Sequence, residues 1–305
     1  MKKALLIYNP KSGKNKTNPP IYKYKEILET YDYKLDVIAT EYKNHAKNII
    51  EKVDFYDIVF SLGGDGTLNE IITGNFHRKE KLKICPLPYG TCNDVASMLG
   101  YTNDNEKNIK MALNGEYHDL DIGTINNTPF IYVVGVGKFL NIPYETTRES
   151  KSKNGYLSYI KNGLNEILNQ MKRYDATITI DGKTLNDKYS IIIISNSNHI
   201  AGIKNFYKNV CLNDEKMEVL LCKAKNIKEL LIDFVCFLTG TPTKNVISIK
   251  GHEIDIKFQE LPEKNWCIDG EKLEEKNNEF TIKTSGKMKV LTPKMKKKCL
   301  FNDNF

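Results

Sequence analysis

The stretch SLGGDGTLNE at residues 61–70 constrains the fold of this chain more than any other. It follows an apolar, β-branched run at 58–60 and leads into an apolar pattern of helical period. This order predicts a strand, a tight glycine turn and a helix. Gly63, Gly64 and Gly66 permit backbone conformations closed to other residues and let a ligand approach the main chain closely.

A turn of this kind is a candidate phosphate site. Successive exposed N–H groups form an anion-binding nest, and the N-terminus of a helix that we expect to begin near Thr67 adds its positive dipole end. Asp65 would repel a phosphate directly, so we expect it to act through a divalent metal, such as a magnesium ion shared with the phosphate, or by ordering a nearby donor. The alternative is a turn that needs glycine for its geometry alone.

The composition limits the class of protein. A chain of 305 residues is long for one core, and 40% apolar with 27% charged residues is typical of a globular protein. The net charge of +7 favours an anionic ligand or surface, but no aromatic-basic pattern of nucleic-acid recognition accompanies it. Seven scattered cysteines without metal-ligand spacing fit a reducing cytosol. No stretch reaches the length of a membrane span, so we expect a cytoplasmic protein that meets a membrane only from outside.

The first 125 residues alternate strands with helices, which predicts a mainly parallel, doubly wound sheet. Expected strands are 4–8, 35–40, 57–62 and 82–88, and expected helices are 22–30, 46–53, 95–99 and 108–117. Two strands end in loops that carry glycine and aspartate, 63–67 and 90–94. Such strand ends bind ligands in open α/β sheets. Asn93 or Asp94 acting only as a helix N-cap is the alternative for the second loop.

Beyond a boundary near residue 125, alternating segments dominate and predict an antiparallel β-sandwich over 126–287. The segments are 129–136, 176–180, 189–195, 217–222, 246–258 and 280–283, with helices expected at 156–171 and 227–238. The last stretch, 288–305, is a candidate to complete the first domain.

Six motifs in this order resemble the soluble diacylglycerol kinase catalytic-domain family, which includes bacterial lipid kinases and sphingosine kinases. They are NPKSG at 9–13, GGDGTLNE at 63–70, PYGTCND at 88–94, DIG at 121–123, KNGYLSY at 153–159 and DGE at 269–271. The resemblance extends along most of the chain. It implies an NAD-kinase-like N-terminal domain that binds ATP and a C-terminal β-sandwich that helps to hold a lipid.

The resemblance also assigns residues. ATP contacts carry over to Asn9, Pro10, Lys11, Ser12, Gly13, Thr40, Gly64, Asp65, Gly66, Thr67, Leu68, Asn69, Glu70 and Thr91. The general base of the family falls on Glu271, with Asp269 as the alternative. A carboxylate there would accept the proton of the acceptor hydroxyl as the P–O bond forms.

A second, structural metal of the family maps to the Asp214 carboxylate and the main-chain oxygens of Cys211 and Lys216. Here the sequence departs from the family, because the usual Asp-Gly is Asp214-Glu215. Asp94 and Asp121 would join the polar network that links this ion to the active site.

The sequence thus predicts an ATP- and Mg²⁺-dependent lipid kinase that phosphorylates diacylglycerol or a similar lipid presented by a membrane. The rivals are an NAD kinase, against which the 90–94 and 269–271 loops argue, and a nucleotide-binding regulator without catalysis. The acceptor and the oligomeric state stay open, and a homodimer is compatible with the sequence. The basic-apolar tail Lys294, Lys296, Lys297, Lys298, Leu300 and Phe301 is either membrane-facing or a frayed, solvated end.

Overall fold

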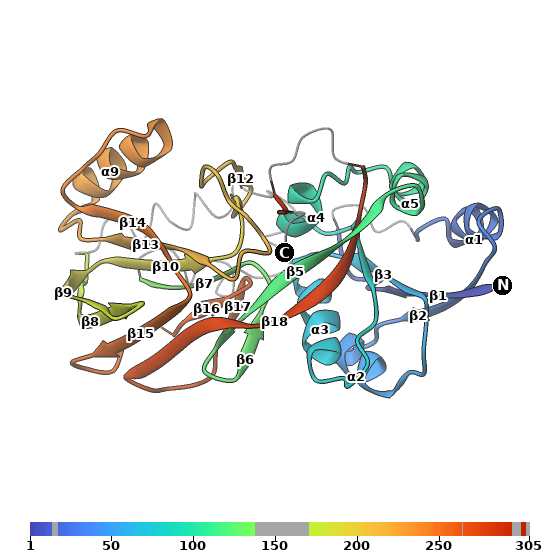
Figure 1. Cartoon of the computed structure of the whole chain (residues 1–305), viewed down its shortest axis with the longest axis horizontal. Coiled ribbons are helices and arrows are strands. Elements are labelled where there is room, and N and C mark those ends of the chain that lie inside the picture. Colours follow the sequence, from blue (N-terminus) through green and yellow to red (C-terminus); the bar gives the residue numbers. More distant parts are fainter. Residues whose placement is uncertain (14–17, 138–170, 264, 295–299, 303–305) are drawn as a thin grey trace.

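The computed structural model describes residues 1–13, 18–137, 171–263, 265–294 and 300–302. Figure 1 shows an N-terminal α/β half beside a C-terminal half that is built almost entirely of strands. The motif at 153–159, most of the helix expected at 156–171 and Lys296, Lys297 and Lys298 lie outside the described residues.

The N-terminal half contains the predicted doubly wound sheet. The parallel strands stand in the order β2-β1-β3-β4. Helices α1, α4 and α5 cover one face and α2 and α3 the other (Figure 1). All six residues of β3 are buried, as expected for a strand covered on both faces. The elements are β1 (Lys2–Tyr8), α1 (Ile21–Glu29), β2 (Tyr33–Ala39), α2 (His45–Lys52), β3 (Ile58–Gly63), α3 (Asp65–Phe76), β4 (Ile84–Pro88), α4 (Asp94–Met98) and α5 (Asn105–Leu113).

The strand order reverses between β1 and β3. The chain leaves β1 for β2 on one side and returns to β3 on the other side of β1. Loops that leave neighbouring strands in opposite directions open a crevice at the carboxyl edge of the sheet. The 9–13 loop and the glycine turn begin at this switch point.

Two long strands connect the halves. β5 (Glu116–Ile125) and β18 (Glu279–Thr292) pair antiparallel along nearly their full lengths, with a register shift between Thr284 and Gly286. The end of β18 also pairs with β4 at Val290 and Ile84, while its beginning pairs with β15 (Glu253–Phe258) in the C-terminal half. One ten-stranded sheet therefore runs through both halves.

The C-terminal half packs part of this sheet against a second, antiparallel one, which confirms the predicted sandwich. The second sheet has the order β14-β13-β10-β7-β16-β17. Between the sheets lies a core that includes Trp266, Phe258, Phe280 and Phe130. The remaining elements are β6 (Thr128–Phe130), β7 (Val133–Gly137), β8 (Tyr174–Ile180), β9 (Lys183–Tyr189), β10 (Ile191–Ser195), β11 (His199–Ile200), β12 (Ile203–Lys204), β13 (Met217–Cys222), α9 (Ile227–Thr239), β14 (Val246–Gly251), β16 (Cys267–Ile268) and β17 (Glu271–Lys272).

Three local expectations were wrong. The segment 246–258 is two strands in different sheets, and Gly251 separates them where a Cβ would lie 2.4 Å from the Ile180 side chain. The helix expected over 108–117 ends at Leu113, and Tyr117 already belongs to β5, whose pairing with β18 outweighs the local pattern. The segment 129–136 is also two strands in different sheets, β6 and β7. α3 begins at Asp65, near the expected start at Thr67, and Gly64 has the extended backbone of an N-cap.

Residues 300–302 are packed, which corrects both interpretations of the tail for Leu300 and Phe301. Leu300 and Phe301 are buried in the core of the N-terminal half. The Phe301 ring stacks on His118 at 4.3 Å, and the Leu300 carbonyl accepts a hydrogen bond from Leu212 N at 2.7 Å. Among the described residues, no helix is both long enough and apolar enough to cross a bilayer.

Candidate active site

Four parallel strands end at the same edge of the sheet and bring the predicted loops together. Asn9 N donates to Leu62 O at 3.1 Å, Tyr89 N to Gly63 O at 2.8 Å, and Thr40 N to Tyr8 O at 2.8 Å. The 9–13 loop, Thr40, the glycine turn and the 89–94 loop therefore surround one position at the switch point.

The glycine turn and the 89–94 loop touch backbone to backbone. A Cβ on Gly90 would lie 2.4 Å from Gly64 Cα, so only glycine fits there. Asn93, in the left-handed region at φ 53°, holds this approach. Its Oδ1 accepts from Gly90 N at 2.7 Å, and its Nδ2 donates to Gly90 O at 2.9 Å. Gly13 joins from the third loop, since a Cβ there would lie 2.8 Å from Tyr89 O.

Gly66 is a glycine of another kind. It lies inside α3 with no positive φ, and a Cβ there would meet only Glu271 Oε1, at 3.8 Å. Glycine in a helix costs stability relative to alanine, and no steric constraint of the fold offsets that cost here. The Glu271 carboxylate instead lies next to the start of α3, where a side chain at position 66 would contact it.

Asp65 faces the start of α4. Its two carboxylate oxygens accept from Asp94 N at 3.1 Å and Val95 N at 3.2 Å. Burial raises the pKa of Asp65 above its usual range, and these N–H bonds oppose the shift. Burial, followed by the charge of Asp65, raises the pKa of Asp94 to about 7. In the described part of the chain neither carboxylate has a Lys, Arg or His partner within ion-pair distance.

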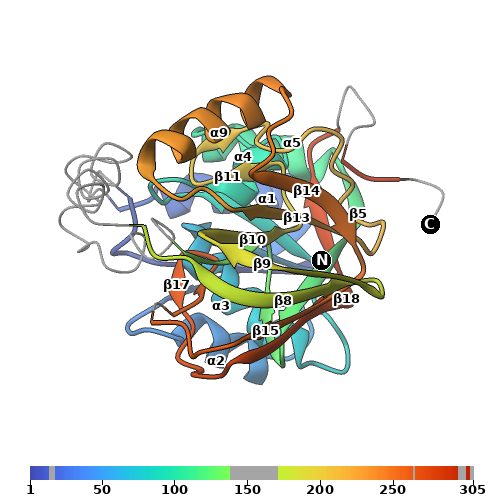
Figure 2. The ribbon, with the colours of Figure 1, turned by 90° about the vertical axis from the view of Figure 1, so that its left-hand side faces the viewer.

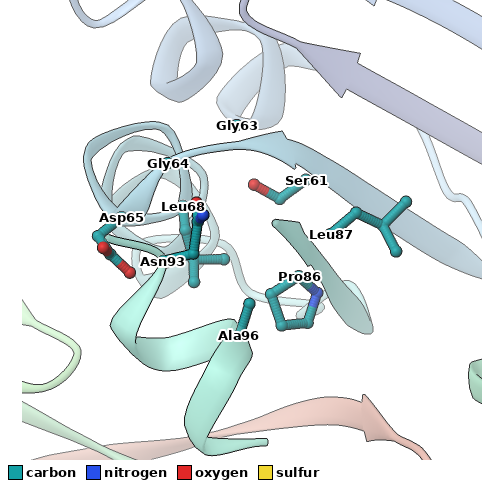
Figure 3. Close-up of a pocket in the computed structure, with 9 residues that line it drawn as sticks. All are labelled: Ser61, Gly63, Gly64, Asp65, Leu68, Pro86, Leu87, Asn93 and Ala96. Atoms are coloured by element: carbon teal, nitrogen blue, oxygen red, sulfur yellow. The ribbon is translucent and has the colours of Figure 1, made fainter. Parts of the chain in front are cut away.

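Two buried carboxylates without a cationic partner suit a divalent cation, although the Asp94 oxygens also accept from Gly202 N at 2.9 and 3.2 Å. Burial raises both pKa values, and a hard cation would oppose that shift. Oxygen ligands are those that Mg²⁺ prefers. A small pocket beneath the turn, drawn in Figure 3, adds Ser61, whose buried Oγ has no hydrogen-bond partner in the described residues.

The predicted turn at 269–271 contributes two carboxylates with opposite environments. Asp269 is 3% exposed, and its oxygens accept from Ile131 N at 2.7 Å, Tyr132 N and Val133 N at 3.0 Å each, and Asn69 Nδ2 at 2.7 Å. Burial raises its pKa to about 6, although these donors oppose the shift. Asp269 thus joins β17, the start of β7 and α3 in one network.

Glu271 is the exposed member of this turn. Its Oε2 lies 3.2 Å from Lys43 Nζ, in an ion pair in which both side chains are more than half exposed. Because its Oε1 lies 3.8 Å from the Cβ position of Gly66, Glu271 lies beside the glycine turn. Lys43 lies in none of the predicted motifs. Because 228 positions separate it from Glu271 along the sequence, no local pattern indicated this ion pair.

Several predicted ATP contacts have structural partners. Thr67 and Leu68 are buried, and Thr67 Oγ1 accepts from Asn9 Nδ2 at 3.4 Å. Glu70 caps α2, accepting from Asn44 N at 2.8 Å and Ala46 N at 3.1 Å. The predicted contacts at the rim of the crevice that keep partly or fully exposed side chains are Pro10, Lys11, Ser12 and Thr91.

The predicted metal region around Asp214 contains a lysine that the sequence did not point to. Asp121 is 2% exposed; its Oδ2 accepts from Glu215 N at 2.6 Å, and its buried Oδ1 accepts no hydrogen bond from the described residues. Lys287 Nζ lies 4.0 Å from that oxygen and 3.0 Å from Glu215 Oε1. Burial raises the pKa of Asp121 to about 6, a shift that Lys287 opposes.

Asp214 itself accepts a hydrogen bond from Lys216 N at 3.1 Å. No group of three or more His, Cys, Asp or Glu side chains in the described residues is arranged to hold a metal. A cation at this position would thus depend on main-chain oxygens such as those of Cys211 and Lys216. Glu215 has the left-handed φ of 62°, which explains the preference for glycine at this position of the motif.

Substitution by alanine should change the free energy of unfolding in opposite directions at Gly90 and at Gly66. Gly90→Ala forces Gly64 and Gly90 apart and should lower the free energy of unfolding by about 1–3 kcal/mol. Gly66→Ala, which meets no close contact in α3, should raise it by roughly 0.5–1 kcal/mol. Urea unfolding of both variants measures the contrast, and a destabilised Gly66→Ala would show that this glycine serves the fold.

The chain is similar to known diacylglycerol kinases in sequence and in fold. The family model described as diacylglycerol kinase catalytic domain matches residues 3–125. A diacylglycerol kinase of Staphylococcus aureus is 30% identical over 275 residues, which cover 88% of this chain and 86% of that protein. Its counterpart from a bovine strain is 29% identical over 272 residues, with the same shares. The crystal structure of a diacylglycerol kinase from Bacillus anthracis superposes with a TM-score of 0.71 at 19% identity, covering 95% of this chain and 97% of that one. The chain belongs to the diacylglycerol kinase family of lipid kinases.

Proposed function

We propose that this protein transfers the γ-phosphate of ATP, with Mg²⁺, to a lipid hydroxyl, and that diacylglycerol is the acceptor. The observation that carries the proposal is the position of the Glu271 carboxylate beside Gly66, the residue that follows Asp65 in the first turn of α3. The relatives that share most of the chain length bear the name diacylglycerol kinase, which supports this acceptor.

The nucleotide phosphates would lie against the glycine turn and the first turn of α3. The backbone N–H groups there are accessible because Gly64 and Gly66 have no side chains, and the positive end of the helix favours an anion. The exposed Lys11 at the neighbouring strand end would offset further negative charge. Thr67 and Leu68 are buried behind the turn and would make no direct contact with the nucleotide.

Asp65 and Asp94 would hold Mg²⁺ on the phosphates. The ion supplies charge neutralisation to the transferred phosphoryl group. For this chain, the N–H groups of Asp94 and Val95 orient the Asp65 carboxylate. Both raised pKa values would then fall when the cation is present.

Glu271 is the better candidate for the general base. A base must reach the acceptor hydroxyl, and the Glu271 carboxylate is exposed beside Gly66, while both oxygens of Asp269 already accept N–H bonds. We assign Asp269 the positioning of the turn. Lys43, paired with Glu271, would keep the carboxylate directed toward α3.

Of the two rivals, the regulator without catalysis is disfavoured because the side chain of Glu271 is exposed and, among the described residues, forms an ion pair with Lys43 alone. An NAD kinase would use the same glycine turn. Family membership favours the lipid acceptor over NAD.

We further propose that the protein works in the cytoplasm and associates with the membrane surface from that side, where its acceptor is held. No nucleic acid is part of this proposal. A structural cation at Asp214, close to the Asp121 Oδ1 that accepts no hydrogen bond from the described residues, would connect the two halves.

The assay for the proposed reaction is transfer of labelled γ-phosphate from ATP, with Mg²⁺, to diacylglycerol in mixed micelles, alongside a lipid extract and NAD. We expect label in phosphatidic acid. Label in another lipid of the extract would change the acceptor, and label in NAD would overturn the lipid assignment. ATP binding without any labelled product would favour the regulator.

Glu271→Gln should lower kcat by roughly 10²–10⁴-fold while ATP affinity stays within about twofold, because a base acts in the transition state. Glu274→Gln is the matched control, a neighbouring glutamate that also pairs with a lysine, and should behave as wild type. If Asp269→Asn lost turnover without loss of stability and Glu271→Gln did not, the base would be misassigned.

Asp65→Asn should lower turnover by at least about 10²-fold, because the uncharged amide holds Mg²⁺ poorly and the ion's stabilisation of transferred charge is lost. Circular dichroism should show a retained fold. Turnover near that of the wild type would contradict the role of Asp65 at the phosphates.

The Asp214 cation can be tested without turnover. Added Mg²⁺, in the absence of nucleotide, should raise the Tm of wild type and of Asp65→Asn, but not that of Asp214→Asn. A Tm independent of Mg²⁺ in all three proteins would indicate that Lys287 alone compensates Asp121.

A further inference from the structure

Helix α9 packs one apolar face inward, with Leu230 and Phe237, and exposes a second one. Leu231, Ile232 and Val235 are 55%, 62% and 59% exposed, whereas Asp233 is 3% exposed. The Asp233 carboxylate accepts from Asn245 Nδ2 at 3.0 Å. The outer face of a helix on the surface of a globular protein is normally polar or charged.

The three exposed side chains form one stripe. Positions 231 and 235 are one turn apart, and 232 adjoins both, so their side chains share a face of α9. Figures 1 and 2 both show α9 at the periphery, outside β13 and β14. A contiguous apolar stripe on an outer helix marks an interaction surface, whereas scattered single residues would not.

The helix is fixed to the protein in this orientation. Asn226 caps its start by accepting from Glu229 N at 3.0 Å, and Gly240 ends it in the left-handed conformation at φ 80°. On the inner side, the Phe237 ring lies 5.1 Å from that of Phe206 and 5.6 Å from that of Tyr207. The outward face is therefore a stable feature of the packed helix.

Lysines flank the stripe at both ends of α9. Lys225 and Lys228 stand at its start, and Lys208 and Lys244 lie near its end, where Lys208 Nζ is 3.1 Å from the Cβ position of Gly240. None of the four makes an ion pair with another described residue.

The acidic groups of α9 are occupied elsewhere. The Glu229 carboxylate accepts from Lys225 N at 2.8 Å and Asn226 Nδ2 at 3.1 Å at the helix start, and Asp233 is buried. The rim of the stripe is therefore positively charged without internal compensation. This pattern complements an anionic, apolar surface.

We propose that α9 docks the protein on an anionic lipid bilayer by inserting Leu231, Ile232 and Val235 among the acyl chains, with the flanking lysines at the headgroups. The proposal rests on the proposed function, in which the acceptor is held in a membrane. An aliphatic face bordered by lysines is the pattern of an interfacial helix, and each lysine near an anionic surface adds to the attraction.

The test is cosedimentation with vesicles of phosphatidylglycerol and phosphatidylcholine, without ATP. The variant Leu231→Ser/Ile232→Ser/Val235→Ser should bind at least about tenfold more weakly than wild type, because three apolar side chains are removed. Phe55→Ser, at a side chain of similar exposure (58%) in the N-terminal half, should bind as wild type. Lys225→Ser/Lys228→Ser should weaken binding and reduce its dependence on salt.

Turnover of a water-soluble, short-chain diacylglycerol separates docking from chemistry. Equal turnover by wild type and the triple variant, with vesicle binding lost only in the variant, supports the proposal. Vesicle binding by wild type without phosphate transfer to any acceptor would leave the docking role standing and remove the proposed function. Three results would overturn the docking role: unchanged binding by the triple variant, equal loss in Phe55→Ser, or a lipid-free dimer of wild type, seen by sedimentation velocity, that the triple variant abolishes.

Discussion

The contact between Gly64 and Gly90 is the constraint on which the site depends. Two loops that leave neighbouring parallel strands can meet backbone to backbone only because neither residue has a side chain. Asn93 fixes that approach with two hydrogen bonds to Gly90. The start of α4 is thereby placed so that its N–H groups reach the Asp65 carboxylate. The geometry around Asp65 thus follows from sterics before any ligand is present.

A second interaction couples this geometry to the other half of the molecule. Asp269 accepts N–H bonds from the start of β7 and from Asn69 in α3, so the turn that carries Glu271 is tied to the helix that begins at the glycine turn. The continuous strands β5 and β18 add a covalent and hydrogen-bonded link between the halves. The carboxylate beside the glycine turn is therefore positioned by a buried network, while its own side chain stays exposed.

Local patterns in the sequence predicted the parts of the molecule that depend on local chemistry. β1, β3 and β4 and the glycine turn were predicted because short apolar runs that end in turn residues are typical of buried strands. The roles of Asp269 and Lys43 could not be predicted this way, since their partners are 136 or more residues away along the chain. The division of 246–258 was missed because Gly251 acts through contact with Ile180, a residue on another strand.

The same limit applies to surfaces. The tail residues Leu300 and Phe301 pack into the core, and α9 exposes side chains that a helical pattern alone would place inside. Which apolar side chains face water depends on the packing of distant elements, and a family resemblance that assigns catalytic residues carries no information on it.

Hydrogen–deuterium exchange with and without ATP and Mg²⁺ tests whether the nucleotide phosphates bind at the glycine turn, because it reports on the backbone N–H groups there. We expect nucleotide to slow exchange in 63–68 and 89–95. Exchange in the 268–272 turn should slow with them, because Asp269 connects this turn to α3. Protection confined to other segments, with these three unchanged, would contradict this expectation.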